Sequence, residues 1–306
     1  MRHTGYLLLL ALLALLLTSC LGGGGGGTTD PSWHKVNGVV FYMGLAPAAT
    51  FPTGITDAGE ATVYQDFWIS ETPVTYELWY TVRQWALQNG YKIAGHGREG
   101  SHGNAGQEPT AKGEEPVTTV NWRDSLVWTN ALSEMLEYDP VYTYMQEVIR
   151  DSSDVTACHN AIQENVSGFR LPTSPEWELA ARYKGDASSS GAIARDGLYW
   201  TPGSYASGAT ADYNDETATQ AVAWYSENSG GSTKNVGLKA ANALGLCDMS
   251  GNVWEWTFTK KESDREVRGG AWDTTHTFVL QIGRPSNASP GTAYPTVGFR
   301  FVRTAL

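Results

Sequence analysis

Residues 249–300 constrain the fold of this chain more than any other stretch. Two aromatic, glycine-containing segments, residues 251–256 (GNVWEW) and 268–272 (RGGAW), alternate in the manner of strands. The alternation disappears over residues 273–297, which are irregular and mostly uncharged, and a short strand-like segment, GFRFV, follows at 298–302. We therefore expect rigid strands that hold an irregular segment out for binding.

The composition favours a sizeable packed domain with much irregular chain. Hydrophobic residues make up 41% of the 306 positions, and the 12 Trp and 15 Tyr need an interior because aromatic side chains are costly to leave in water. The 34 Gly and only 17% charged residues indicate many tight turns, which predicts a loop-rich α+β fold. The net charge of -11 excludes nucleic acid as a partner, since phosphate binding needs clustered Lys and Arg.

The N-terminus is typical of an exported lipoprotein. Residues 1–20 have a basic start, an apolar run too short to span a bilayer, and Cys20 at the end of LTSC, which resembles a bacterial lipobox. We expect Cys20 to be acylated; the alternative is an ordinary secretory signal with an incidental cysteine. Six consecutive glycines follow, so residues 21–32 are expected to be a flexible tether. Residues 33–306 then form one domain, held by its lipid on the outer membrane at the cell surface.

Local signals predict two strands and two helices in the first half of this domain. Residues 39–44 and 64–69 are rich in β-branched and aromatic side chains and predict paired strands. Thr75 is a candidate N-cap of a helix that stops at residues 89–90 (NG), and a second helix is expected over residues 121–136.

A third helix start is better defined than the segments around it. Thr173 and Glu176 have the spacing of a capping box, and the proline between them is allowed in the first turn because the missing N–H would have no partner there. Residues 141–149 are interpreted as a helix within an insertion. Residues 184–242 alternate small-residue loops with isolated aromatics and show no long regular element.

Two histidines and two cysteines lie outside these elements. Residues 94–113 form a predicted insertion loop, and His96 and His102 within it are interpreted as solvated, because no carboxylate or cysteine lies at a ligand spacing. Cys158 and Cys247 either pair or are simply buried, and the sequence leaves both alternatives open.

The separate motifs occur in the order known from one family. The chain carries RLPT at 170–173, DMSGNVWEW at 248–256, RGGAW at 268–272 and GFR at 298–300, and from about Trp33 onward it resembles the formylglycine-generating-enzyme family. The resemblance implies one C-type-lectin-like domain of the formylglycine-generating type: a small twisted antiparallel sheet, flanking helices and much irregular loop. It also implies a scaffold of core aromatics and tight-turn glycines, namely Trp254, Trp256, Gly269, Gly270, Trp272, Gly298 and Phe299.

The enzymatic activity of that family is not expected here. Its oxidase members carry a pair of copper-binding cysteines between the last two motifs, whereas residues 273–297 contain no cysteine. Cys158 and Cys247 lie elsewhere, and no clustered histidines offer the iron site of the related sulfoxide synthases. An oxidase with displaced metal ligands is the first alternative, and an inert surface structural protein is the second.

The last part of the chain resembles another use of this fold. In proteins diversified by retroelements, adenine-directed mutagenesis rewrites Asn-type codons ahead of a fixed tail, and such codons do not give Lys or Glu. After Glu266 this chain contains neither residue. Together with the leader and the missing cysteines, this composition resembles the treponemal variable proteins, with a variable region at about 271–297.

The resemblance implies a variable site for a protein or glycan ligand on another cell or surface. We expect a monomer that is attached to the membrane through its N-terminal lipid anchor. Phe278 and Tyr294 are the expected apolar anchors, and Asp273, His276 and Asn287 the expected polar contacts. The full predicted ligand-binding set is Asp273, Thr274, Thr275, His276, Thr277, Phe278, Gln281, Gly283, Pro285, Ser286, Asn287, Ala288, Thr292, Ala293, Tyr294, Pro295 and Thr296.

Four further polar residues have separate predictions. Asn252 and Glu255 are candidate ligands of a family-type calcium site, since calcium takes side-chain and backbone oxygens; no other cofactor is expected. Arg284 and Arg300 are expected to pair with Glu255 or Asp248 inside the scaffold rather than to contact the ligand.

Overall fold

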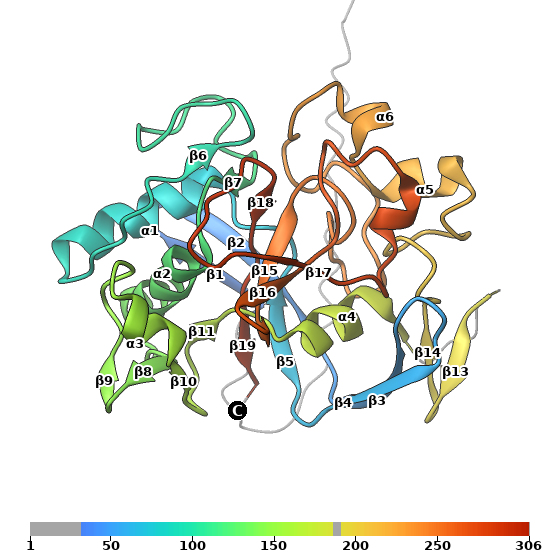
Figure 1. The fold of residues 1–306 in the computed structure, drawn as a ribbon, viewed down its shortest axis with the longest axis horizontal. Helices are drawn as coiled ribbons and strands as arrows, with labels where there is room; N and C mark the ends of the chain where they lie inside the picture. The colour runs from blue at the N-terminus through green and yellow to red at the C-terminus, as the bar shows by residue number, and fades with distance from the viewer. Residues whose placement is uncertain (1–31, 186–190, 306) are drawn as a thin grey trace, which may run out of the picture. The chain divides into compact units, whose positions relative to one another are not determined.

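The computed structural model describes residues 32–185 and 191–305 (Figure 1). The predicted signal peptide, Cys20 and nearly all of the glycine-rich tether lie outside the described residues. Within the described ranges, no helix has both the length and the apolar character needed to cross a membrane.

A five-stranded antiparallel sheet forms the base of the domain. Its order is β1-β2-β5-β19-β11, so a strand near the C-terminus lies between strands from the first and middle parts of the chain. The strands predicted at 39–44 and 64–69 are confirmed as β2 and β5, which pair directly. The bounds are β1 (Trp33–Val36), β2 (Val39–Ala46), β5 (Phe67–Ser70), β11 (Phe169–Arg170) and β19 (Val302–Thr304).

Two long helices, α1 (Tyr76–Gln88) and α2 (Trp122–Met135), pack against each other beside this sheet, at the left of Figure 1. The Thr75 hydroxyl accepts a hydrogen bond from the Leu78 amide, which confirms Thr75 as the N-cap of α1. The Asn121 side chain caps α2 in the same way, at the start of the second predicted helix. Each helix places a tryptophan in the main core. The Trp79 and Trp128 rings stack with centroids 5.9 Å apart, and Phe299 meets both edge-on.

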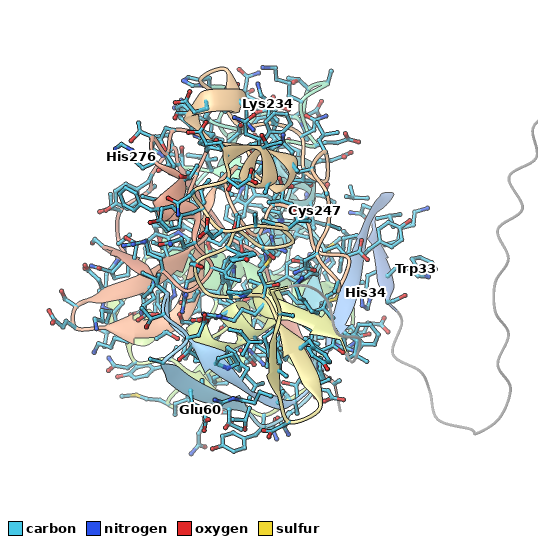
Figure 2. The ribbon with its side chains drawn as sticks, turned by 90° about the vertical axis from the view of Figure 1, so that its right-hand side faces the viewer. Trp33, His34, Glu60, Lys234, Cys247 and His276 are labelled. Carbon is cyan, nitrogen blue, oxygen red and sulfur yellow. The ribbon has the colours of Figure 1, made fainter. Side chains whose placement is uncertain are left out.

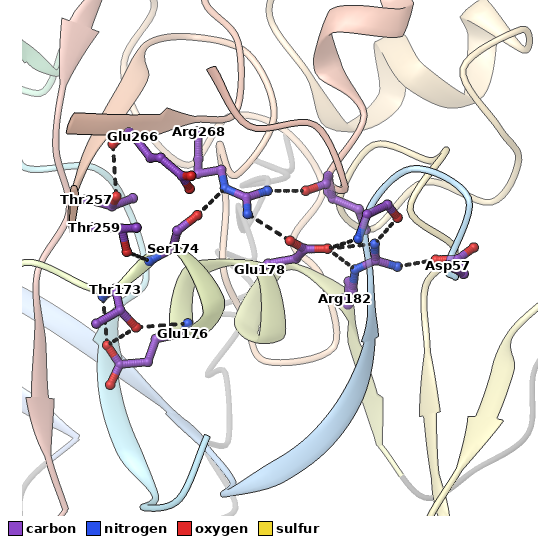
Figure 3. Close-up of polar contacts among 12 residues, drawn as sticks. Asp57, Thr173, Ser174, Glu176, Glu178, Arg182, Thr257, Thr259, Glu266 and Arg268 are labelled. Carbon is purple, nitrogen blue, oxygen red and sulfur yellow. Dashed lines mark hydrogen bonds and ion pairs between the residues drawn. The ribbon is translucent and has the colours of Figure 1, made fainter. Parts of the chain in front are cut away.

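The third predicted helix is α4 (Ser174–Arg182), with the predicted capping box at its start (Figure 3). The Thr173 hydroxyl accepts from the Glu176 amide, and the Glu176 carboxylate accepts from the Thr173 amide at 2.8 Å. Trp177, on the inner face of α4, is fully buried in a second core cluster. Ile69 of β5 and Val302 of β19 belong to the same cluster.

A second, four-stranded sheet carries the residues on which the binding prediction depends. Its order is β17 (Ser286–Ala288), β16 (Asp264–Arg268), β15 (Trp254–Lys261) and β18 (Val297–Gly298). The predicted strands at 251–256 and 268–272 are displaced: β15 begins only at Trp254 and β16 already ends at Arg268. The physical reason is backbone conformation, because Gly251, Gly269 and Gly270 all have positive φ and interrupt the strands.

One segment differs from its predicted structure, and another agrees with it. The predicted helix at 141–149 is wrong: this segment is a hairpin of β8 (Tyr142–Tyr144) and β9 (Glu147–Val148), reversed at Met145 and Gln146, both of which have positive φ. Residues 184–242 hold short elements only. These and the remaining elements are β3 (Ala49–Thr53), β4 (Gly59–Val63), β6 (Arg98–Glu99), β7 (Val117–Thr118), α3 (Val155–His159), β10 (Ile162–Gln163), β12 (Tyr183–Gly185), β13 (Ile193–Arg195), β14 (Leu198–Trp200), α5 (Glu216–Val222), α6 (Ser226–Ser229) and the 3-10 turn η1 (Thr277–Leu280).

Candidate binding surface

A buried ion pair fixes the strands on either side of the irregular segment. The Arg300 guanidinium donates to both carboxylate oxygens of Glu255, at 2.6 Å from Nε and 2.7 Å from Nη2, and neither side chain has any exposed surface. The Trp177 indole N–H donates to the same carboxylate at 2.6 Å. The predicted structural pairing of Arg300 with Glu255 is confirmed, and it joins β15 to the chain just after β18.

A second buried network connects the segment to helix α4 (Figure 3). Arg268 donates from Nη2 to Glu178 at 2.8 Å and from Nη1 to the Ile282 carbonyl at 3.0 Å. Glu178 in turn accepts from Arg182, which also reaches Asp57 at 2.6 Å. The carbonyl of Ile282 is therefore held by a charged group that is itself fully paired, so the middle of the irregular segment is fastened to the core.

Most of the predicted scaffold residues are buried as expected. Trp256, Gly269, Gly270, Gly298 and Phe299 are buried, whereas Trp254 and Trp272 are half-buried. At Gly298 the backbone leaves no room for a side chain. A Cβ on Gly298 would lie 2.5 Å from the Val117 carbonyl oxygen, so this backbone approach accepts only glycine.

The irregular segment is mostly a surface. We call the mostly buried motif segments 251–256, 268–272 and 298–300 the frame. The irregular segment begins after Trp272, passes through η1 and the edge strand β17, and returns through residues 289–296 to β18. Figure 2 shows His276 at the periphery of the domain. Ten of the predicted ligand-binding residues are exposed, namely Asp273, Thr275, His276, Phe278, Pro285, Ser286, Asn287, Thr292, Ala293 and Pro295.

The other predicted ligand-binding residues are less accessible. Four are half-buried, namely Thr277, Ala288, Tyr294 and Thr296, and three are buried, namely Thr274, Gln281 and Gly283. The three buried residues pack against the rest of the domain, which corrects their prediction as ligand contacts. The Thr274 hydroxyl accepts from the Ala271 amide at 3.0 Å, and Oε1 of the Gln281 side chain accepts from the Arg284 guanidinium at 3.1 Å. A Cβ on Gly283 would lie 2.4 Å from the Gly54 carbonyl.

The most prominent feature of this surface is a cluster of three side chains, His276, Phe278 and Arg284. The His276 and Phe278 rings are nearly parallel, 13° apart, with centroids separated by 5.2 Å, and the Arg284 guanidinium lies 5.2 Å from the centre of the Phe278 ring. Arg284 also donates to the Phe278 carbonyl at 2.8 Å. Its predicted pairing with Glu255 or Asp248 is therefore wrong. It braces the η1 turn and keeps Phe278, which is 40% exposed, in a defined position.

Tyr294, the second predicted anchor, is turned partly inward. Its ring packs against Trp256 with centroids 6.5 Å apart, and its carbonyl accepts from the Thr119 amide at 2.9 Å. Only part of the ring remains available to a ligand, so Phe278 offers the larger apolar contact on this surface.

Two loops from other parts of the chain border the irregular segment. His102, exposed in the insertion loop, meets the Trp272 ring edge-on at 5.5 Å. Ser229, at the end of α6, donates to the Trp272 carbonyl at 2.8 Å, and the Ser226 amide donates to the Thr274 carbonyl. These neighbours were not identified from sequence, because the contacts join residues far apart in the chain. The described part of the chain has no group of three or more potential metal ligands that includes His102.

The candidate calcium ligands do not fit a cation site. Both carboxylate oxygens of Glu255 accept from Arg300, and one also accepts from Trp177. The Asn252 amide is equally engaged, since it accepts from the Lys234 amide and donates to the Lys234 carbonyl, both at 3.1 Å. The prediction of calcium at Asn252 and Glu255 is corrected: their oxygens already have protein donors.

The two described cysteines are unpaired and poorly suited to thiolate chemistry. Cys158 and Cys247 are both free, which settles the open question of whether they pair. Burial raises the pKa of Cys158 to about 12 and also raises the pKa of Cys247, so both thiols remain protonated at neutral pH.

These observations define a class of protein: a mixed α+β domain whose buried charged and aromatic frame presents an irregular surface segment. Residues 31–305 match the family model described as the sulfatase-modifying factor enzyme 1-like domain. The chain therefore belongs to the sulfatase-modifying factor, or formylglycine-generating-enzyme, family.

Three relatives make the relationship more specific. The chain is 29% identical over 283 residues to "Chaperone protein LppX" of Paenibacillus barcinonensis, covering 85% of this chain and 88% of the relative. Treponema denticola variable protein 1 superposes with a TM-score of 0.67 at 28% identity, covering 89% of this chain and 98% of that one. CarF superposes with a TM-score of 0.68 at 28% identity, covering 86% and 98%. The predicted C-type-lectin-like fold and the predicted similarity to treponemal variable proteins are confirmed.

Proposed function

We propose that this protein is a surface-displayed lipoprotein that binds ligands through its C-terminal segment, residues 271–297, and that a retroelement diversifies this segment. The observation that carries the proposal is that the segment contains two kinds of residue, buried and exposed. Its fixed points are buried and fully hydrogen-bonded, whereas ten predicted contact residues are exposed. Exposed positions can change at little cost in folding free energy.

The chemistry of the surface suits a protein or glycan ligand. Phe278, in contact with both His276 and Arg284, supplies an apolar contact of defined geometry, and rigid aromatic contacts lose little conformational entropy on binding. Asp273 and Asn287 add exposed polar groups before and after Phe278 in the sequence of the segment. The similarity to Treponema denticola variable protein 1 supports variability at these positions. The protein acts as a monomer anchored through acyl chains on Cys20.

No catalytic role forms part of the proposal. The segment that carries copper-binding cysteines in the family's oxidases lacks cysteine here, and Cys158 and Cys247 favour their protonated forms. Oxygen consumption with a cysteine-containing peptide and added copper or iron should stay at the level of the metal alone. Protein-dependent turnover would favour the oxidase alternative.

Binding is tested with variants that keep the frame intact. The natural chain and a set substituted at Thr275, Phe278 and Asn287 are profiled on a glycan array and against a displayed library of extracellular protein domains. Substitution of Tyr64 and Gln65, exposed on a distant part of the domain, is the matched control. We expect the segment variants to change their binding profile while the control keeps the natural one.

Either of two results contradicts the proposal. If every folded segment variant keeps the natural profile, the binding site lies elsewhere. If none of the chains binds any probe, the inert structural protein is the better description.

A further inference from the structure

The first hairpin carries an outward face that the function above does not use. β1 and β2 pair with Trp33 opposite Tyr42 and Lys35 opposite Val40. Side chains alternate between the two faces of a strand, and the inward-facing residues of this hairpin are buried, namely His34, Val36, Phe41 and Met43. The outer face therefore carries Trp33, Lys35, Val40 and Tyr42 together. Trp33 is 53% exposed, Tyr42 55% and Val40 42%.

The residue types on this face are those that favour the boundary between water and lipid. Trp and Tyr combine an apolar ring with a polar atom and are enriched at membrane interfaces, and Lys can lay its apolar stem on a surface while its ammonium group stays hydrated. Two aromatic rings, one aliphatic side chain and one Lys in two adjacent cross-strand pairs therefore form a compact interfacial patch. We call Trp33, Lys35, Val40 and Tyr42 the hairpin patch.

The position of the patch in the chain indicates what covers it. Trp33 is the thirteenth residue after Cys20. Covalent geometry limits thirteen residues to a span of about 45 Å, so a lipid on Cys20 would keep this hairpin near the bilayer at all times. A surface restrained in this way needs little intrinsic affinity to dock, because its effective concentration at the membrane is high.

The charge around the patch indicates the type of lipid. A hollow of about 440 Å³ borders Val40 and Tyr42, and its lining includes Glu71, Glu77 and Glu114 but no Lys or Arg. The whole chain carries a net charge of -11. Carboxylates beside the patch repel an anionic surface, whereas they attract the ammonium group of a zwitterionic headgroup.

We propose that the hairpin patch docks on the zwitterionic headgroup layer of the membrane to which Cys20 is anchored. The inference rests on the anchoring part of the proposed function. Trp33 and His276 appear on opposite sides of Figure 2, so docking through the patch leaves the C-terminal segment facing away from the lipid. The patch thus orients a surface that a tether alone would present in every direction.

The test uses the acylated chain in vesicles of phosphatidylcholine and phosphatidylethanolamine. A nitroxide label is attached at Val40→Cys or, as the comparison site, at Thr275→Cys. Electron paramagnetic resonance then measures collisions with oxygen, which concentrates in lipid, and with a water-soluble nickel chelate. We expect the label at position 40 to favour oxygen, the label at 275 to favour the chelate, and vesicles with phosphatidylglycerol to weaken the contrast.

Two double variants separate the patch from general effects. Trp33→Glu with Tyr42→Glu should lower the docked fraction about tenfold, which corresponds to about 1.4 kcal/mol. Tyr64→Glu with Leu238→Glu introduces the same charges at sites that are at least as exposed and should leave docking unchanged. Thermal unfolding of both variants checks that the fold is retained.

Three results overturn the inference in distinguishable ways. Aqueous collisions at position 40 on an acylated chain exclude docking but leave anchoring and ligand binding intact. Spin–spin broadening at position 40 without vesicles shows that a second copy covers the patch instead. Mass spectrometry showing no acyl chain on Cys20 removes the anchor and with it this docking, while array binding tests the C-terminal segment independently.

Discussion

Glu255 and Arg300 form a bidentate ion pair with no exposed surface on either side chain. Arg300 also donates to the carbonyls of Ser70 and Cys247, each at 2.9 Å, so it joins three separate parts of the chain. A buried pair of this kind contributes less to stability than its short distances suggest, because both ions lose their hydration. Removing one partner is far more costly, since the other charge stays buried without compensation.

The first prediction follows from this asymmetry. Arg300→Met should lower the free energy of unfolding by about 3–5 kcal/mol, because Glu255 would remain buried with only Trp177 as a donor. Urea denaturation followed by tryptophan fluorescence measures the change. Lys92→Met, which breaks the exposed ion pair with Asp151, is the control and should stay within about 0.5 kcal/mol of the natural chain. Equal effects of the two substitutions would refute the structural role of Arg300.

The buried carboxyl group of Asp248 should make the free energy of unfolding fall as the pH rises from 4 to 6. Burial raises its pKa from 3.8 to about 6, and its Oδ1 has no hydrogen-bond partner, while Oδ2 accepts from the Gly237 amide at 2.8 Å. Between pH 4 and pH 6 the folded chain keeps this proton and the unfolded chain loses it. The contribution of Asp248 to stability is therefore present below about pH 4 and falls by about 3 kcal/mol as the pH rises to 6.

Asp248→Asn tests this pH dependence. The variant should be more stable than the natural chain at pH 7.5 and similar to it at pH 4, as measured by urea denaturation at both values. Glu176→Gln should behave in the opposite sense. Despite burial, Arg170 and the neighbouring hydrogen bonds hold the pKa of Glu176 below its usual value, so its contribution is present at neutral pH and is lost in acid. A gain for Asp248→Asn that is equal at both pH values would contradict the assignment.

Two adjacent threonines in the C-terminal segment differ in burial. Thr274 is buried and its hydroxyl accepts from the Ala271 amide, whereas Thr275 is exposed. Thr274→Val keeps the shape but leaves a buried N–H without an acceptor, which should cost about 1–3 kcal/mol. Thr275→Val should change the free energy of unfolding by less than about 0.5 kcal/mol. Thermal unfolding of the two single variants measures the difference, and a tolerant Thr274 would place it in the variable set after all.

Glycine at position 298 should be irreplaceable even by alanine. A Cβ there would lie 2.5 Å from the Val117 carbonyl oxygen, and relief requires moving backbone. Gly298→Ala should therefore destabilise the fold by about 1–3 kcal/mol or more. At Gly291, which is exposed, an added Cβ would meet only the end of the Arg123 side chain at 3.4 Å, so Gly291→Ala serves as the matched control. Circular dichroism melting curves report both, and similar melting temperatures would argue against the close approach.

The sequence predicted those features whose causes are local. The caps at Thr75 and Thr173 involve side chains and amides within three residues of one another, so their patterns are visible without tertiary structure. The apolar run at 141–149 was misassigned because a short run of this kind suits a helix or a strand, and only the pairing of β8 with β9 and β10 decides between them.

The site was predictable in location but not in detail. Thr274 and Thr275 are chemically identical, and only the folded chain buries one of them. Glu255 was a reasonable calcium ligand until its partner was known, and that partner lies 45 residues away in sequence. The contact between His102 and Trp272 joins two loops that no local pattern relates. Motifs therefore locate the frame, while the burial of individual side chains depends on contacts between distant segments.

The place of β19 in the five-stranded sheet has a consequence for chains that end early. Residues 273–296 are translated before β19, and β19 hydrogen-bonds to both β5 and β11. A frameshift or stop codon anywhere in the segment removes β19 and Arg300 together, so the sheet remains split and Glu255 unpaired. Such chains should be substrates for proteolysis. The completed sheet therefore requires that residues 273–296 were translated in frame.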